Sequence, residues 1–410
     1  MSLRRALVSL VCALGLPCVA CASHDAAAPA PGRDGGADPG AEAAIDAESL
    51  PLDAFVAEQM SVAKLPGLAA VVVRDGKVAW QGYYGFADLE SKTPVRADTI
   101  FLLASISKTF TATAAMRAVE DGKLSLDDDV DRWLPGWALR NPKHADAPIT
   151  LRMLLGHVSS INESYVRLFG LITPGDATQP IDAFLRDFLL PGGKSYAADV
   201  FADDVPGARY SYSQVGVAAV GEAIERATGA PFDRYVKEVI VTPLGMRDTS
   251  FRLADLDVAR VAVPYTLLPS GPKRNEHWGA PFYPAATMHS TAVELAKFLV
   301  SFVRTPGVTS PRAISAASQE EMLKIQYPAA NADGAVLWDW RTLDDGSRIV
   351  GHTGAAPGVS TTMFLRPSDG VCVITLTNSD VHIRVDLTHD EELAAYRAIE
   401  ARLFRDAAKL

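Results

Sequence analysis

The sequence predicts an α+β fold: one antiparallel sheet built from both ends of the chain, helices on its faces, and a mostly helical second lobe. Strand pairs joined by short turns containing glycine occur near both ends of the 410-residue chain, and such short connections join antiparallel strands. Between them lies a long helical and loop-rich section without convincing strand pairs. We therefore expect one domain at residues 49–410, with a sheet lobe at about 49–123 and 285–410 and a helical lobe at about 124–284.

The first elements of this domain are expected to be a helix, a hairpin and a second helix. Apolar spacing over residues 52–65 indicates an amphipathic helix. Residues 68–88 contain two strand-like runs joined by Asp-Gly, which is a strong hairpin signal. The apolar run at residues 101–116 predicts a buried helix that ends near Gly122.

The later elements are identified by helical periodicity and by alternating runs that flank further turns. The last helix has acidic residues in its first turn and lysine in its last turn, as the helix dipole favours. In chain order we expect helices at residues 213–229, 232–242 and 290–303, strands at 335–343, 348–354, 360–367 and 371–378, and a closing helix at 390–410.

The first 22 residues have the features of an export signal. Arg4 and Arg5 form a positively charged start, and the apolar run "ALVSLVCALGL" that follows is too short to span a bilayer. Export would place the protein in the periplasm, on a membrane or in the medium.

Two cleavage sites compete at the end of this signal. "ACA" is an A-x-A-like site that would release a soluble protein starting at Ser23, whereas "CVAC" resembles a lipobox that would make Cys21 a lipidated first residue. Residues 23–48 are rich in Ala, Pro, Gly and Asp and cannot bury a core, so they are expected to form a flexible tether. A tether favours the lipoprotein, with membrane contact only through the lipid anchor.

Composition excludes several classes of function. The chain has a formal net charge of −10 and no basic runs, which argues against nucleic acid as a partner. The eight histidines are scattered, and the body contains neither HExxH nor C-x-x-C. Cys372 is alone in the body and alternates like a buried strand residue. We expect no disulfide, metal or organic cofactor.

The chemistry suggested by the sequence begins with Ser105 and Lys108, which lie three residues apart at the head of an apolar helix and so share a face. Serine needs a neighbouring base, and lysine becomes one only if burial lowers its pKa well below about 10.4. S-x-x-K alone occurs by chance in chains of this length. The pair gains weight from two later motifs, "YSYSQVG" and "GHTGAAPG".

In this order the three motifs resemble the S-x-x-K, Y-x-N and K-T-G signature of the serine β-lactamase and penicillin-binding protein superfamily. The sequence flanking the three motifs is similar to that of the class C-related branch of this superfamily, which includes family VIII esterases and D-aminopeptidases. "LLGHVSSI" is similar to "LLTHTSGL", and "STAVELAKF" to the "STA-D-LARF" pattern. The resemblance covers nearly all of the chain from residue 50 and implies a β-lactamase/transpeptidase-like fold.

The resemblance implies specific roles for the catalytic residues. Ser105 would be the acylated nucleophile and Lys108 the acceptor of its proton. Tyr212 would pass a proton to the leaving group and is a candidate base for deacylation.

The resemblance also implies a substrate-binding and oxyanion set. Gln214 stands at the asparagine position, where a side-chain amide contacts the acyl group. His352, Thr353 and Gly354 form the third motif, and the backbone N–H of Ala355 would join that of the nucleophile in the oxyanion hole.

Two of these positions depart from the family pattern. Gln214 is one methylene longer than asparagine, with the same donors and acceptors. His352 replaces lysine and is mostly uncharged at neutral pH, so it would hold a β-lactam carboxylate less well. An esterase or peptidase is therefore favoured over a β-lactamase.

Other polar and aromatic side chains are expected to be structural. His157 should order its loop through hydrogen bonds, Tyr210 should pack in the lobe, and His289 should be packed or solvated. Trp338 and Trp340 alternate on an expected strand, so at least one of them is expected in the core and the other could line an acyl pocket. Phe282 and Tyr283 could line the same pocket from the helical lobe.

Two functions follow from these observations. The first is an exported serine hydrolase that acts through an acyl-enzyme at Ser105 on a small ester, amide or peptide. The second is a tethered binding protein that keeps the fold but has lost turnover.

Overall fold

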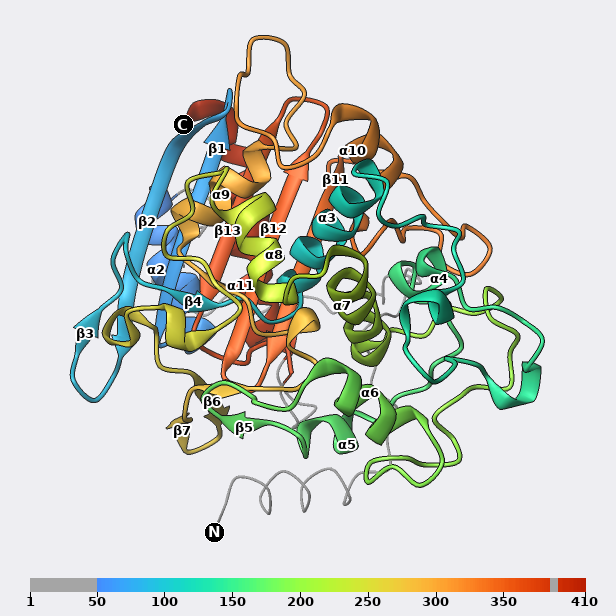
Figure 1. Ribbon diagram of the computed structural model, residues 1–410. Coiled ribbons are helices and arrows are strands. Elements are labelled where there is room, and N and C mark those ends of the chain that lie inside the picture. Colours follow the sequence, from blue (N-terminus) through green and yellow to red (C-terminus); the bar gives the residue numbers. More distant parts are fainter. Residues whose placement is uncertain (1–49, 384–389) are drawn as a thin grey trace, which may run out of the picture.

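The computed structural model describes residues 50–383 and 390–410, so the export signal and tether expected within residues 1–48 lie outside the described residues. Seven antiparallel strands form the central sheet in the order β10-β11-β12-β13-β1-β2-β3 (Figure 1), which confirms the predicted α+β fold. The strands of this sheet are β1 (Gly67–Arg74), β2 (Lys77–Asp88), β3 (Thr93–Pro94), β10 (Asp339–Thr342), β11 (Arg348–Ala356), β12 (Val359–Arg366) and β13 (Val371–Thr377).

Two segments distant in sequence meet at the centre of this sheet. β1, from the N-terminal part, pairs with β13, with Val71 opposite Ile374. β1 and β2 form the expected hairpin, whose turn residues Asp75 and Gly76 both have positive φ, at 53° and 71°. Positive φ at both central residues is the geometry of the turn that Asp-Gly favours.

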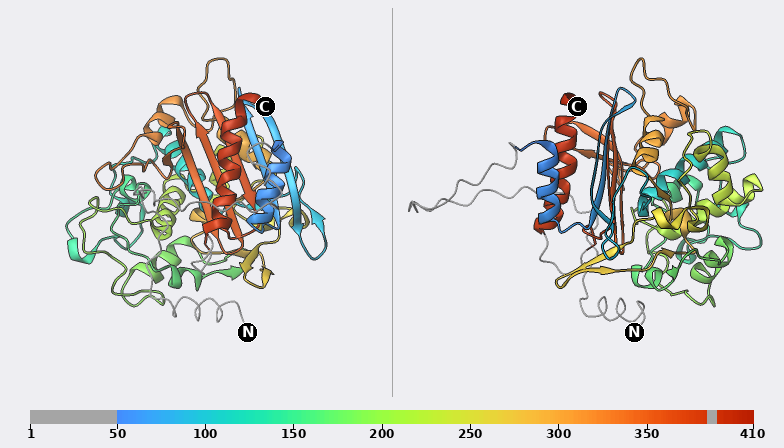
Figure 2. Two further views of the ribbon diagram at one scale, coloured as in Figure 1. Left: turned by 180° about the vertical axis from the view of Figure 1, so that it is seen from behind. Right: turned by 90° about the vertical axis from the view of Figure 1, so that its left-hand side faces the viewer.

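Helices cover both faces of the sheet (Figure 2). α2 and α11 cover one face, where Phe55 and Tyr396 join a core with Val72. α3 and α9 cover the other face, where Phe110 stacks on Phe298 at 4.0 Å between ring centroids. The helices are α2 (Leu52–Val62), α3 (Ser107–Glu120), α4 (Leu151–Leu155), α5 (Tyr165–Phe169), α6 (Ile181–Leu189), α7 (Gln214–Thr228), α8 (Phe232–Val236), α9 (Ala292–Val300), α10 (Ala316–Leu323) and α11 (Asp390–Asp406).

Three expectations about elements are corrected. The helix expected from residue 101 starts at Ser107, because Phe101 pairs with Ser290 in a short strand instead. The strand expected at residues 335–343 is reduced to β10. The section at 124–284 contains short strands as well as helices. The strands outside the main sheet are β4 (Phe101–Leu102), β5 (Thr173–Pro174), β6 (Tyr265–Leu268), β7 (Gly271–Arg274), β8 (Trp278–Gly279) and β9 (His289–Ser290).

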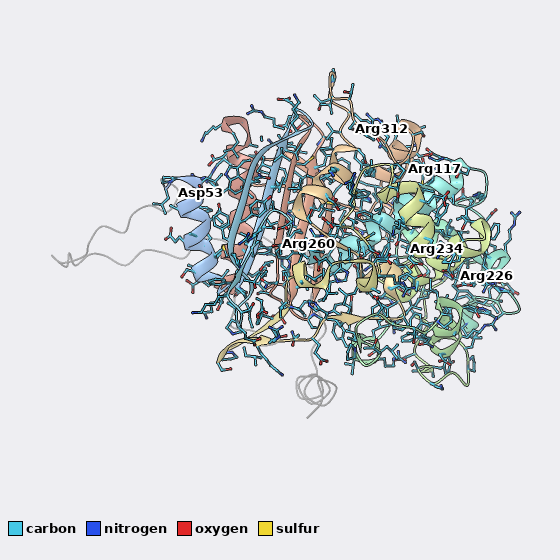
Figure 3. The ribbon with its side chains drawn as sticks, turned by 60° about the vertical axis from the view of Figure 1, so that its left-hand side comes forward. Asp53, Arg117, Arg226, Arg234, Arg260 and Arg312 are labelled. Carbon is cyan, nitrogen blue, oxygen red and sulfur yellow. The ribbon has the colours of Figure 1, made fainter. Side chains whose placement is uncertain are left out.

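Figure 3 draws the side chains, and three of the arginines that it labels are ion-paired: Arg117 with Asp121, Arg226 with Glu222 and Arg260 with Asp248. Solvent-exposed pairs contribute about 0–1 kcal/mol each, so the fold depends mainly on the two cores. None of the helices in the described part of the chain is long and apolar enough to cross a membrane.

Candidate active site

Ser105 lies in a tight helical turn, Ala104–Ile106, between β4 and α3. The pairing of β4 with β9 continues into this turn, because Leu103 N–H donates to the Met288 carbonyl at 2.7 Å. Ala104 has a φ of 48°, in the left-handed region that L-residues other than glycine rarely adopt. The surrounding packing holds this strained turn and fixes the position of Ser105 at the start of α3.

Lys108 is completely buried, and its amine lies within hydrogen-bond distance of three oxygens. Nζ is 3.1 Å from Ser105 Oγ, 2.5 Å from Gln214 Oε1 and 2.8 Å from the Ala285 carbonyl oxygen. The amide and carbonyl oxygens only accept, so a neutral amine directs its two N–H bonds to them. The lone pair of that amine is then left for the serine hydroxyl.

The electrostatics of Lys108 suit a base. Burial lowers the pKa of Lys108 to about 7, against the smaller opposing effects of Glu163 and Asp339. Near neutral pH a large fraction of the side chain is therefore uncharged. The sequence prediction that burial turns this lysine into a base is consistent with its position.

Tyr212 completes the catalytic cluster. Its hydroxyl is hydrogen-bonded to that of Ser105, and its ring centroid lies 4.7 Å from Lys108 Nζ. Burial raises the pKa of Tyr212 well above its ordinary value, so the phenol is protonated at neutral pH. A protonated phenol that is hydrogen-bonded to the serine and lies beside the lysine can relay a proton.

Glu163 fixes the start of α7 and was not identified from the sequence. Its carboxylate accepts hydrogen bonds from Ser213 Oγ at 2.9 Å, Gln214 N–H at 2.8 Å and Val215 N–H at 2.9 Å. A carboxylate at a helix N-terminus satisfies free N–H groups and interacts favourably with the helix dipole. This contact positions Gln214, whose side chain holds Lys108.

His157 orders the neighbouring loop, as its sequence context suggested. It has a φ of 56°, and its Nδ1 accepts the Ser213 N–H at 3.1 Å. Its ring lies 4.4 Å from that of Tyr212. Burial, together with Lys108, lowers the pKa of His157 well below its ordinary value, so it supports Tyr212 as a neutral ring.

β11 packs against the serine turn and carries the third motif. A Cβ atom on Gly354 would lie 2.2 Å from the Leu103 carbonyl oxygen and 2.1 Å from Thr361 Oγ1, so only glycine permits this close approach. β10 pairs with β11 only as far as Gly351, which leaves residues 352–356 beside the serine turn. Thr353 and Ala355, which are half-buried, lie in this segment.

His352 is buried and neutral. Burial, assisted by the charge of Lys108, lowers the pKa of His352 to about 4. Its Nδ1 hydrogen-bonds the Thr353 carbonyl, and its Nε2 lies 3.8 Å from Oδ2 of Asp339. Asp339, the first residue of β10, is a second site residue that no motif indicated.

The suggested pocket aromatics are packed away from the site. Trp338 packs against Phe302 in the core, and Phe282 packs against Phe184. Tyr283 lies against Phe232, and Trp340 is half-buried, with Nε1 donating to the Leu323 carbonyl at 2.9 Å. Trp338 confirms the expectation that at least one of the two tryptophans is in the core, and Phe282 and Tyr283 are also buried.

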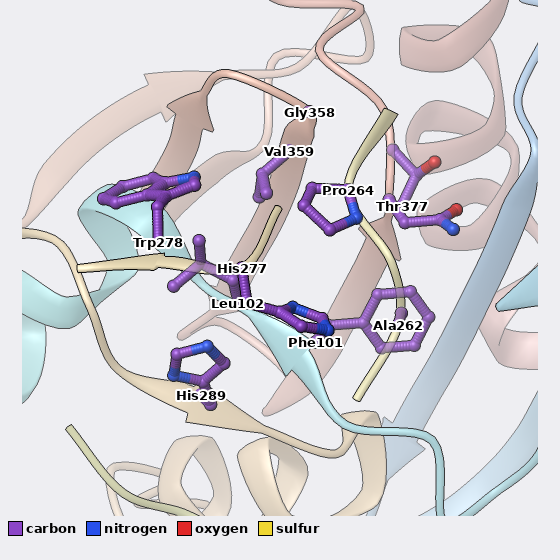
Figure 4. Close-up of a pocket in the computed structure, with 11 residues that line it drawn as sticks. Phe101, Leu102, Ala262, Pro264, His277, Trp278, His289, Gly358, Val359 and Thr377 are labelled. Atoms are coloured by element: carbon purple, nitrogen blue, oxygen red, sulfur yellow. The ribbon is translucent and has the colours of Figure 1, made fainter. Parts of the chain in front are cut away.

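Two other expected structural residues are buried. His289 is 2% exposed and lines, with Leu102 and Trp278, a cavity of ≈ 10 Å³ next to β4 (Figure 4). That volume holds roughly one water molecule, so the cavity cannot take an acyl group. Cys372 is a free, buried thiol on β13, which confirms its assignment as a core residue. Among the described residues, no group of three or more His, Cys, Asp or Glu is placed to hold a metal ion.

Comparisons with known proteins agree with this geometry. The profile of the family described as Beta-lactamase matches residues 52–397. Over 224 residues the chain is 36% identical to esterase EstB of Burkholderia gladioli, a match that covers 54% of this chain and 56% of the esterase. The chain thus spans just over half the length of that relative.

Solved structures show the same fold. The D-amino acid amidase of Ochrobactrum anthropi SV3 superposes with a TM-score of 0.67 at 20% identity, covering 87% of this chain and 98% of the amidase. An octameric penicillin-binding protein homologue from Pyrococcus abyssi superposes with a TM-score of 0.64 at 24% identity, covering 87% and 76%.

Proposed function

Because the chain belongs to the β-lactamase family, we propose that it is a serine hydrolase that forms an acyl-enzyme at Ser105 with a small ester or amide. The observation that carries the proposal is the environment of the Lys108 amine, whose three oxygen neighbours include the Ser105 hydroxyl at 3.1 Å. Gln214 and the Ala285 carbonyl take the other two directions, so the serine lies where the lone pair points.

The reaction follows from this arrangement. Ser105 Oγ attacks the carbonyl carbon while its proton passes to neutral Lys108. The negative charge that develops on the carbonyl oxygen is stabilised by the backbone N–H groups of Ser105 and Ala355. When the tetrahedral intermediate collapses, the bond to the leaving group breaks, and Tyr212 relays the proton from Lys108 to that group.

Deacylation uses the same residues in the opposite direction. Water attacks the ester carbonyl on Ser105, and its proton passes to the Tyr212–Lys108 pair. The bond to Ser105 Oγ then breaks, and the serine recovers its proton as the acid leaves. Neither step needs a cofactor.

The mass of the intact protein after mixing with 4-nitrophenyl butyrate tests this proposal. We expect a butyryl adduct on the wild type that maps to Ser105, no adduct on Ser105→Ala, and release of nitrophenol beyond one equivalent. An adduct that never clears would place the defect in deacylation, at Gln214. Absence of any adduct, with this ester and with a penicillin, would overturn the proposal in favour of the tethered binding protein.

We also propose that the protein is exported and anchored through a lipid on Cys21. The support is the basic start, the short apolar run and the Ala/Pro/Gly-rich segment between residues 23 and 48. Mass spectrometry of the mature N-terminal peptide tests this. A diacylglyceryl cysteine is expected, and Cys21→Ala should release the protein from membranes. An N-terminus at Ser23 would show a soluble exported form, and a retained Met1 would overturn export.

A further inference from the structure

Two hydrogen-bond acceptors face each other at the junction of β10 and β11. Nδ1 of His352 lies against the Thr353 carbonyl, which can only accept, so Nδ1 carries the ring proton and Nε2 is a bare lone pair. Among acidic side chains, Asp339 lies nearest to this nitrogen, with its Oδ2 at 3.8 Å from His352 Nε2. This separation is too long for a hydrogen bond, and neither atom has a hydrogen-bond donor among the described residues.

Nearby cations do not fill this gap. Arg341 pairs with Glu400 and lies over the Phe364 ring, 4.0 Å from its centroid. Arg348 pairs with Asp333 at 3.0 Å. The amine of Lys108 is already surrounded by its three oxygen neighbours, and the neutral ring of His352 contributes no charge.

The carboxylate of the pair is accessible from solvent. The Asp339 side chain is 43% exposed, whereas that of His352 is 5% exposed, so an incoming group meets the carboxylate first and the imidazole beneath it. The centroid of the His352 ring lies 6.4 Å from that of the Tyr212 ring, and the Tyr212 hydroxyl is hydrogen-bonded to Ser105. The two acceptors therefore lie next to the residues that contact the nucleophile.

We propose that His352 Nε2 and the Asp339 carboxylate form a subsite for a protonated amine carried by the substrate. An ammonium group supplies the donors that both acceptors lack and the positive charge that Asp339 attracts. A substrate carboxylate at the same place would be repelled by the Asp339 carboxylate and by the lone pair of His352 Nε2. The inference rests on the proposed function, and it names the substrate class as esters or amides with a cationic amine near the reacting carbonyl.

The subsite is tested at pH 7 with the methyl esters of L- and D-alanine, whose amine is cationic. Their hydrolysis is compared with that of the neutral N-acetyl and the anionic N-succinyl derivatives. We expect kcat/KM to follow the order ammonium, neutral, anion. In Asp339→Asn the ratio of the ammonium ester to the neutral ester should fall about tenfold. Comparing this ratio between variants cancels the size difference between the esters.

Asp369→Asn is the matched control, since it removes an acid of similar exposure, 45%, that already has a partner in Arg366 at 2.7 Å. It should leave the ratio within about twofold. His352→Lys should invert the preference toward the anionic ester, because it places a cation where the lone pair was. An unchanged ratio in Asp339→Asn would overturn the subsite.

The two proposals fail differently. If Ser105→Ala and the wild type behave alike toward 4-nitrophenyl butyrate, the acyl-enzyme is wrong. If the wild type cleaves that ester without preference among the charged esters, only the subsite is wrong. Binding of alaninamide and N-acetylalaninamide to Ser105→Ala, measured by calorimetry, gives a readout without turnover. Tighter binding of alaninamide that Asp339→Asn abolishes supports the subsite, and equal binding overturns it.

Discussion

The two walls of the candidate site, one formed by the nucleophile residues and one by strand residues, are built on different principles. In the nucleophile wall, formed by Ser105, Lys108 and Tyr212, the serine and the lysine are buried, the tyrosine is half-buried, and the polar groups hydrogen-bond within the protein. The strand wall, formed by Asp339 and His352, is partly open and presents two acceptors without a donor between them. A wall with fixed partners suits proton transfer at a constant geometry, and a wall with unused acceptors suits recognition of a group that arrives with the substrate.

The largest effect is expected from Lys108→Met, which keeps the volume of the nucleophile wall and removes its base. General-base contributions are about 10²–10⁴-fold, so we expect the acylation rate to fall by roughly 10³-fold. The burst of nitrophenol from 4-nitrophenyl butyrate measures this rate. Lys324→Met, an exposed lysine paired with Glu321, is the control and should acylate normally. Acylation within tenfold of wild type would mean that Lys108 is not the base.

Gly354→Ala tests whether the strand that carries the third motif must lie against the serine turn. The added Cβ would overlap the Leu103 carbonyl oxygen, so β11 must move away and with it the Ala355 N–H. Loss of one oxyanion donor costs about 10²–10³-fold in kcat, and we expect a decrease of about 10².

The matched control for this substitution is Gly346→Ala in the β10–β11 turn. Gly346 has open space around it but a φ of 80°, so alanine there should cost stability without reducing kcat. Equal kcat in the two variants would contradict the close-approach argument. Thermal unfolding measured alongside kcat separates the two effects.

Burial of the Lys108 amine in the nucleophile wall should also reduce the free energy of unfolding. The decrease of the Lys108 pKa from 10.5 to about 7 corresponds to about 5 kcal/mol at roughly 1.4 kcal/mol per pH unit. Lys108→Met removes this cost but leaves the Gln214 and Ala285 oxygens unpaired, at about 1–3 kcal/mol each. We therefore expect the variant to be more stable at pH 7 by about 1 kcal/mol.

The pH dependence of this difference checks its origin. Between pH 7 and 10 the unfolded wild-type chain binds the lysine proton and the folded chain does not, so raising the pH stabilises the wild type. The variant lacks this gain, and the difference should shrink as the pH approaches 10. Denaturant unfolding of both chains at pH 7 and pH 10 measures it, and a constant difference would contradict the burial cost.

The sequence was sufficient to predict the site residues that local spacing or motif order brings together. Ser105 and Lys108 are three residues apart, and a turn running into a helix places them in contact whatever surrounds them. Three strand pairs of the sheet, β1–β2, β10–β11 and β12–β13, were likewise marked by Asp-Gly in their turns. Alternation correctly predicted that at least one of Trp338 and Trp340 is in the core, and Trp338 is that residue, but alternation alone does not show which side chains line an acyl pocket.

Glu163 and Asp339 could not be found in this way, because each reaches the site through tertiary contact. Glu163 meets Ser213 across 50 residues of sequence, from a loop with no periodicity of its own. Asp339 faces His352 only because β10 pairs with β11, which places Asp339 opposite Gly351. Carboxylates in loops and at strand ends are common, and whether one has a functional role depends on the residues that face it in the folded structure.

Glu163→Gln gives the smallest expected effect and separates electrostatics from positioning within the nucleophile wall. The Glu163 charge raises the pKa of Lys108, so removing it should lower that pKa further. The base must be neutral to act, and kcat/KM therefore rises with pH through a midpoint near 7 in the wild type and a lower one in the variant. A pH profile with 4-nitrophenyl butyrate measures the midpoint, and Glu321→Gln on the surface is the control. If Glu163 only holds the start of α7, kcat/KM falls equally at every pH and the midpoint stays in place.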